Sequence, residues 1–131
     1  MLPFWALFLL FGVLGWLLDT SYRSIVDKKY APGTWLPYFG LIYAIGGTLC
    51  VLLFENIHVS APVQVLIGTL AAVVLEFVGG VLSLAILRRR LWNYSHERLH
   101  FMGHIDMLHT VYWFAIVILV RVAYGVLTGY P

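Results

Sequence analysis

The chain has 131 residues, of which 62% are hydrophobic and 11% are charged, and its formal net charge is +2. This composition excludes an ordinary soluble domain, which is nearer half apolar and a quarter charged, and the small net charge gives no reason to expect nucleic-acid binding. A single cysteine, Cys50, excludes an intrachain disulfide and a cysteine-based zinc cluster. Together with a mean hydropathy of +0.91, these values predict an integral membrane protein with one domain, residues 1–131.

Four apolar segments approach the length of roughly 20 residues that a membrane-spanning helix needs. The first has no Lys or Arg before it and no small-x-small cleavage pattern after it, so we expect a retained helix and not a signal peptide. The second is the shortest and is expected to begin near Pro37. The sequence predicts an all-α, four-helix membrane bundle with spans at about 3–25, 37–54, 63–87 and 107–127.

The positive charges predict the orientation of these spans. Only Arg121 lies toward one side of the membrane, and the other seven cations lie at the first and third connections: Arg23, Lys28, Lys29, Arg88, Arg89, Arg90 and Arg98. By the positive-inside rule, both basic connections face the cytoplasm and both termini lie outside the cell membrane. These connections could also contact anionic lipid headgroups.

Glu76 stands in the middle of the third segment, where a charge is costly unless it is paired, protonated or turned toward a polar cavity. It shares a helix face with small residues, including Ala72 and Gly80, which predicts an inward orientation. Asp19 in the first segment lies about 25 Å from the outer end and Glu76 about 20 Å, so the two acids are expected at similar depth. Arg23, one turn after Asp19, could neutralise it.

The third connection contains His96, His100 and His104 at four-residue spacing. On one helix face these side chains could bind zinc or copper, or titrate near neutral pH. Gly103 interrupts such a helix, and no cysteine completes a ligand set. The pattern therefore favours an interfacial segment, and we expect no metal and no other cofactor.

We expect this interfacial segment to fold back at the membrane surface with its aromatic rings, Trp92 and Tyr94, at headgroup depth. Ser95 is predicted to cap a short helix that begins at His96 and ends at Gly103. The Arg98 guanidinium could then turn inward to Asp19 or Glu76, bind a lipid phosphate, or remain solvated.

Several of these residues also carry a family resemblance. The elements Trp92-x-Tyr94-Ser95-x-x-Arg98, Gly103-x-Ile105 and Trp113-Phe114 resemble the family known as putative ABC-transporter type IV, or CmpB-like. Nearly the whole chain follows that pattern in order, although Asp19 stands where the family usually has Glu. The matching elements in the first three helices are Gly15-Trp16 with Asp19 and Tyr22, Pro37-Tyr38-x-Gly40, and Leu75-Glu76-Phe77 with Gly79.

The resemblance implies a permease-like subunit of a membrane complex. No Gly-rich phosphate loop, HExxH motif or nucleophile with a paired base is present, so an enzyme is not favoured. Four helices leave little room for a complete pathway, so a homo-oligomer or larger complex is expected. A scaffold in which the same residues only fix helix packing is the alternative. The predicted polar intramembrane site comprises Glu76, Asp19, Arg98, Trp16 and Tyr22, beside an interfacial motif of Trp92, Tyr94, Ser95 and Gly103.

Overall fold

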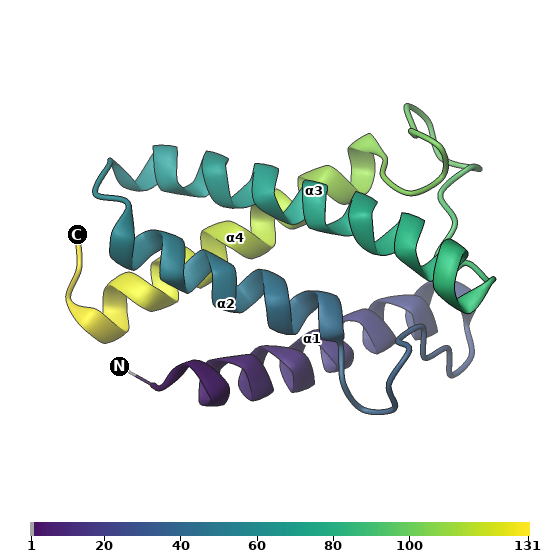
Figure 1. Cartoon of the computed structure of the whole chain (residues 1–131), viewed down its shortest axis with the longest axis horizontal. Helices are drawn as coiled ribbons and strands as arrows, with labels where there is room; N and C mark the ends of the chain where they lie inside the picture. The colour runs from purple at the N-terminus through teal and green to yellow at the C-terminus, as the bar shows by residue number, and fades with distance from the viewer. Residues whose placement is uncertain (1) are drawn as a thin grey trace. The chain divides into compact units, whose positions relative to one another are not determined.

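The computed structural model describes residues 2–131, and Figure 1 shows an all-helical chain. No strand occurs in these residues apart from two isolated bridges, so the all-α prediction is confirmed. Three of the helices are long and apolar enough to cross a membrane, whereas α2 has 16 residues and is shorter. The helices are α1 (Phe4–Asp27), α2 (Leu41–Asn56), α3 (Ala61–Leu87) and α4 (Met107–Thr128).

The second helix begins later than the sequence predicted, at Leu41 and not near Pro37. Tyr38 has a φ of 60°, in the left-handed region, and Leu36 forms a bridge with Phe39. This reverse turn cannot continue into a helix, because successive residues of an α-helix need negative φ values. The four residues before Leu41 therefore form a turn instead of a first helical turn.

The chain divides into two compact units, residues 2–48 and residues 49–131, with the boundary inside α2. In the N-terminal unit, α1 and the first half of α2 approach closely at glycines. A Cβ on Gly15 would lie 2.0 Å from the Tyr43 Cβ. Beside this crossing, the Gly40 amide donates to the Gly12 carbonyl at 2.8 Å. Small residues thus allow direct backbone contact, as they do at many membrane helix interfaces.

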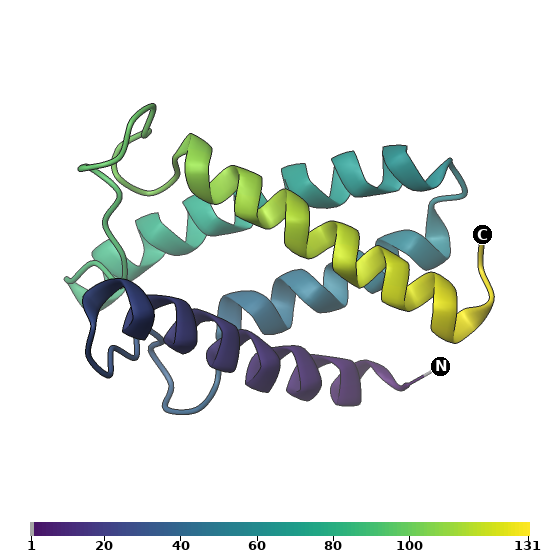
Figure 2. The same ribbon diagram turned by 180° about the vertical axis from the view of Figure 1, so that it is seen from behind.

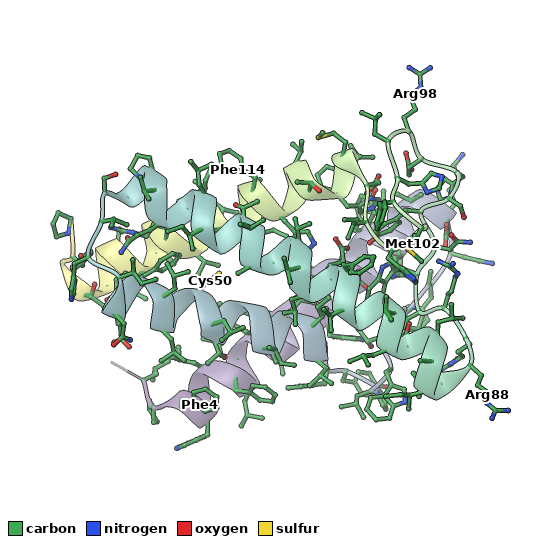
Figure 3. The ribbon with its side chains drawn as sticks, turned by 45° about the horizontal axis from the view of Figure 1, so that its top comes forward. Phe4, Cys50, Arg88, Arg98, Met102 and Phe114 are labelled. Atoms are coloured by element: carbon green, nitrogen blue, oxygen red, sulfur yellow. The ribbon has the colours of Figure 1, made fainter. Side chains whose placement is uncertain are left out.

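In the C-terminal unit, α3 and α4 pack side by side (Figures 1 and 2). Gly68 provides the space for this contact, because a Cβ there would lie 2.9 Å from the Val117 Cγ1. The second half of α2 completes the core with Cys50, labelled in Figure 3, and Phe54. Cys50 is therefore a packed small residue, as its apolar surroundings in the sequence indicated.

Residues 88–106, which we call the connector, join α3 to α4 without a helix. The predicted short helix from His96 to Gly103 is wrong. Ser95 does not cap a helix, because its amide and its hydroxyl both donate to the Asn93 Oδ1 in a local turn. Leu99 and Met102 have left-handed φ values of 53° and 55°, which a continuous helix excludes. The chain instead reverses direction through successive turns.

Candidate polar site around Glu76

Glu76 lies on the buried face of α3 and is 4% exposed. Its two carboxylate oxygens accept hydrogen bonds from different parts of the chain. The Tyr94 hydroxyl in the connector donates to Oε1 at 2.8 Å, and the Trp113 Nε1 in α4 donates to Oε2 at 2.9 Å. The indole N–H can only donate, so it fixes Oε2 as an acceptor. The carboxylate therefore links the middle of α3 both to α4 and to the connector.

Tyr94 is held by further contacts at the start of α4. Its amide donates to the Gly103 carbonyl at 2.9 Å, and its ring stacks on His109 with centroids 3.9 Å apart. The His109 Nδ1 lies 2.6 Å from the Asp106 Oδ1, and the same oxygen accepts from the His109 amide as the N-cap of α4. The cap that begins α4 thus also orients the ring stack that supports Tyr94.

His104 fills the space beside Gly80 on α3. A Cβ on Gly80 would lie 2.6 Å from the His104 Nδ1, so this part of the small-residue face contacts the connector. The imidazole packs edge-on against Phe77, and the His104 carbonyl accepts from the Trp92 Nε1 at 2.9 Å. Burial lowers the pKa of His104, and the nearby positive charge of Arg90 lowers it further. Both effects favour the neutral form of the His104 imidazole.

Asp19 belongs to the N-terminal unit and has its own partners. Its Oδ2 accepts from the Arg23 Nε at 2.9 Å, and its Oδ1 accepts from the Tyr43 hydroxyl at 3.3 Å. The Arg23 guanidinium passes close to Gly33, where a Cβ would lie 2.2 Å from the Cζ. Because Asp19 and Glu76 lie in separate units, their expected proximity stays a prediction.

The other members of the predicted site are arranged differently. Trp16 contacts Tyr38 edge-on with centroids 5.1 Å apart, and Tyr22 is 38% exposed. Arg98 is exposed, and Figure 3 shows its side chain pointing away from the helices. The inward contact of Arg98 with Glu76 is therefore not formed.

The three histidines of the connector do not form a cluster. His96 pairs with Glu97, the His100 Nδ1 accepts from the Gly103 amide at 3.2 Å, and His104 is buried. Within residues 2–131, no group of three or more His, Cys, Asp or Glu side chains is arranged to hold a metal ion. The loss of the predicted helix explains this, because only a helix would have placed the three imidazoles on one face.

Sequence reasoning did not identify Trp113, His109 and Asp106 as neighbours of the Glu76 site. Trp113 offered a signal, because an indole N–H inside an apolar span needs an acceptor, and Glu76 is the acid of the adjacent span. His109 and Asp106 offered only the sequence pattern of a helix N-cap. Their contact with Tyr94 depends on the turns of the connector.

One protein-family model matches nearly the whole chain. The family model described as Putative ABC-transporter type IV matches residues 6–129. The chain belongs to this family. The match includes Glu76, Tyr94 and Trp113, and it confirms the resemblance seen in the sequence. Comparisons with curated proteins and with solved structures gave no match. Family membership and the apolar helices together identify an ABC-transporter-related membrane protein.

Proposed function

We propose that this chain is a permease-like subunit for transport, with Glu76, Tyr94 and Trp113 at its polar intramembrane site. The observation that carries the proposal is the hydrogen bond between Tyr94 in the connector and Glu76 in the middle of α3. Buried ionisable groups in spans commonly mark ion or substrate pathways. A proton or cation that binds Glu76 would compete with its Tyr94 donor and so would alter the connector, outside the span.

The connector is also the region through which we propose that partners act. The chain has no phosphate-binding loop, so any ATP hydrolysis would come from a partner subunit. We propose four spans in the cell membrane, with α2 as the second, both termini outside, and a homo-oligomer or larger complex. Arg88 and Arg98, which point away from the helices in Figure 3, would contact anionic lipid headgroups or such a partner.

Thiol labelling tests the orientation. Lys29→Cys and His96→Cys place thiols at exposed positions on the two basic connections, in a Cys50→Ser background. Because the proposal puts both connections in the cytoplasm, these thiols should resist an impermeant maleimide in intact cells. Ser60→Cys, between α2 and α3, should react and serves as the control. Labelling of residue 29 or 96 from outside would overturn the orientation.

Ion movement in liposomes tests transport. We would reconstitute the purified protein with an entrapped pH-sensitive dye and impose proton, sodium or chloride gradients. The proposal expects that at least one of these gradients drives proton movement faster than in empty liposomes. Glu76→Gln should reduce this proton movement at least tenfold. Glu55→Gln is the matched control, because Glu55 lies near the end of α2 and away from the Tyr94 and Trp113 donors.

The second candidate function is a membrane scaffold without transport. It is favoured by the fact that both oxygens of Glu76 accept hydrogen bonds from neighbouring segments, as a packing role requires. A scaffold predicts no Glu76-dependent flux under any of the three gradients. It also predicts that Glu76→Gln changes thermal stability or oligomeric state as its main effect, which size-exclusion chromatography with light scattering would measure.

A further inference from the structure

The connector lies beside the last turns of α3 instead of extending beyond them (Figures 1 and 2). The ring of Phe101 packs against Phe77 with centroids 5.7 Å apart, and the His104 Nδ1 lies against Gly80. From Phe77, α3 continues to Leu87, ten residues later, which is a distance of about 15 Å. The connector therefore returns along the side of a helix that is apolar enough to cross a membrane.

The length of α3 sets the depth of this contact. Its 27 residues measure about 40 Å, whereas the hydrocarbon core of a bilayer is about 30 Å thick. Even if the whole excess of about 10 Å stood outside the hydrocarbon at the connector end, Phe77 would still lie about 5 Å inside it. Connector side chains at the level of Phe77 would then contact lipid and not water.

The connector exposes three apolar side chains beside this contact. Leu99 is 76% exposed, and Phe101 and Met102 are each 58% exposed. Their backbone is nevertheless fixed, because the Phe101 amide donates to the Ile105 carbonyl at 2.8 Å and the Arg90 Nη1 donates to the Met102 carbonyl at 3.0 Å. Leu99 and Met102 also hold the left-handed φ values that are disfavoured for residues other than glycine. An ordered turn that holds apolar side chains outward at this cost indicates a contact surface.

The aromatic residues expected at headgroup depth are turned toward the protein instead. The Trp92 Nε1 donates to the His104 carbonyl, and the Tyr94 hydroxyl donates to Glu76. Both side chains are only half-exposed. They therefore hold the connector against α3 and leave the outward apolar surface to residues 98–102, which we call the tip.

Positive charge adjoins the apolar side chains of the tip. Arg98 is exposed and points away from the helices in Figure 3, and Arg88, Arg89 and Arg90 are exposed at the start of the connector. None of the ion pairs in residues 2–131 includes these four arginines. A long arginine side chain can hold its charge at the headgroups while its neighbours contact acyl chains. The planar guanidinium also matches two oxygens of a phosphate.

We propose that the tip is a lipid anchor. Leu99, Phe101 and Met102 enter the boundary between headgroups and acyl chains of one leaflet, and Arg98 binds the phosphate of an anionic lipid. Apolar burial of about 5–10 Å combined with attraction to anionic lipid is how surface segments bind membranes. The anchor rests on the headgroup contact proposed above for Arg98, but not on transport through Glu76.

Spin-label accessibility tests the anchor in the full-length protein in nanodiscs. In a Cys50→Ser background, a nitroxide attached to Leu99→Cys or Met102→Cys would be exposed to molecular oxygen, which concentrates in lipid, and to a nickel chelate, which stays in water. Lys29→Cys gives the aqueous reference, and Leu70→Cys, exposed on α3, gives the lipid reference. The oxygen-to-nickel relaxation ratio at residues 99 and 102 should exceed that at residue 29 several-fold and approach that at residue 70.

Lipid composition tests the role of Arg98. An equal mixture of phosphatidylglycerol and phosphatidylcholine should raise the oxygen-to-nickel ratio at residue 102 above its value in phosphatidylcholine alone, because the anionic phosphate draws Arg98 and the tip toward the leaflet. Arg98→Gln should remove this increase. Arg88→Gln is the matched control and should retain it, because Arg88 also points away from the helices but lies outside the tip.

Each outcome decides the proposal. A ratio at residues 99 and 102 equal to that at residue 29 would overturn the anchor. A label that neither reagent reaches would also overturn it, because a second copy or another protein would then cover the tip. An effect of phosphatidylglycerol that is absent, or that survives Arg98→Gln, would refute the phosphate contact.

Two features keep these outcomes decisive. If Met102→Cys does not fold, Leu99→Cys decides in both lipid compositions, because Leu99 is the most exposed residue of the three. The measurement needs no ion gradient, so it separates the anchor from transport. A tip in water would leave Glu76-dependent flux untouched, and an absence of flux would leave the anchor standing.

Discussion

Two acids within the apolar helices of this chain, Asp19 and Glu76, are stabilised over very different sequence distances. Asp19 pairs with Arg23, four residues later on the same helix, and its other donor is Tyr43. The donors to Glu76 come 18 and 37 residues later, from the connector and from α4. Asp19 is thus neutralised largely within α1, whereas the environment of Glu76 exists only when α3, α4 and the connector have assembled. An acid with local partners can stabilise a helix, but an acid with distant partners reports on tertiary structure.

The largest expected effect comes from removing the Glu76 carboxylate. Glu76→Leu should lower the free energy of unfolding by about 2–4 kcal/mol, because it leaves the Tyr94 hydroxyl and the Trp113 indole N–H without their acceptor. Unfolding in mixed micelles with increasing SDS would measure this change. Glu76→Gln should cost less, since its amide oxygen can still accept one bond. A loss below about 0.5 kcal/mol for Glu76→Leu would contradict the assigned hydrogen bonds.

Removing one donor at a time should give intermediate effects. Tyr94→Phe and Trp113→Phe should each lower stability by about 1–2 kcal/mol, because each removes one buried hydrogen bond and leaves a Glu76 oxygen without that donor. A double-mutant cycle between Tyr94→Phe and Glu76→Gln should show a coupling energy of at least about 0.5 kcal/mol. The matched cycle of Arg98→Gln with Glu76→Gln should show none, because Arg98 points outward (Figure 3). Coupling of Arg98 equal to that of Tyr94 would reverse this assignment.

A smaller effect is expected from pH through His104. Its pKa in the folded protein lies below the ordinary value of 6.5, because of burial and then Arg90. The unfolded chain therefore binds a proton more readily, so stability is complete above about pH 6.5 and falls as the pH decreases toward the folded-state pKa. The slope for one group cannot exceed about 1.4 kcal/mol per pH unit.

Thermal unfolding between pH 7.5 and 5.5 would measure this loss of stability. His104→Phe keeps a ring beside Gly80 and Phe77 but cannot titrate, so its profile should be flatter in that window. A profile parallel to that of the original chain would assign the acid sensitivity to other groups.

The sequence predicted the helical fold and the family because those features are encoded locally. Helix length follows from apolar composition, and the Asp19–Arg23 pair follows from i,i+4 spacing. The connector could not be predicted in the same way. Its turns depend on residues with positive φ values, such as Leu99, at positions where no glycine in the sequence marks a turn. They also depend on the hydrogen bond from the Tyr94 amide to the Gly103 carbonyl. Thus Glu76 was identified as a candidate, while its partners depended on a loop that residue patterns describe poorly.

The smallest expected effect concerns the local acid, Asp19. Its side chain is 16% exposed and that of Arg23 is 27% exposed, so part of their attraction is screened. Asp19→Asn should therefore lower stability by only about 0.5 kcal/mol, because the amide oxygen still accepts from Arg23 or from Tyr43. The same SDS titration used for Glu76 would compare the two acids directly. If Asp19→Asn cost as much as Glu76→Leu, Asp19 would also depend on tertiary structure, and the contrast between a local acid and a distantly bonded acid would fail.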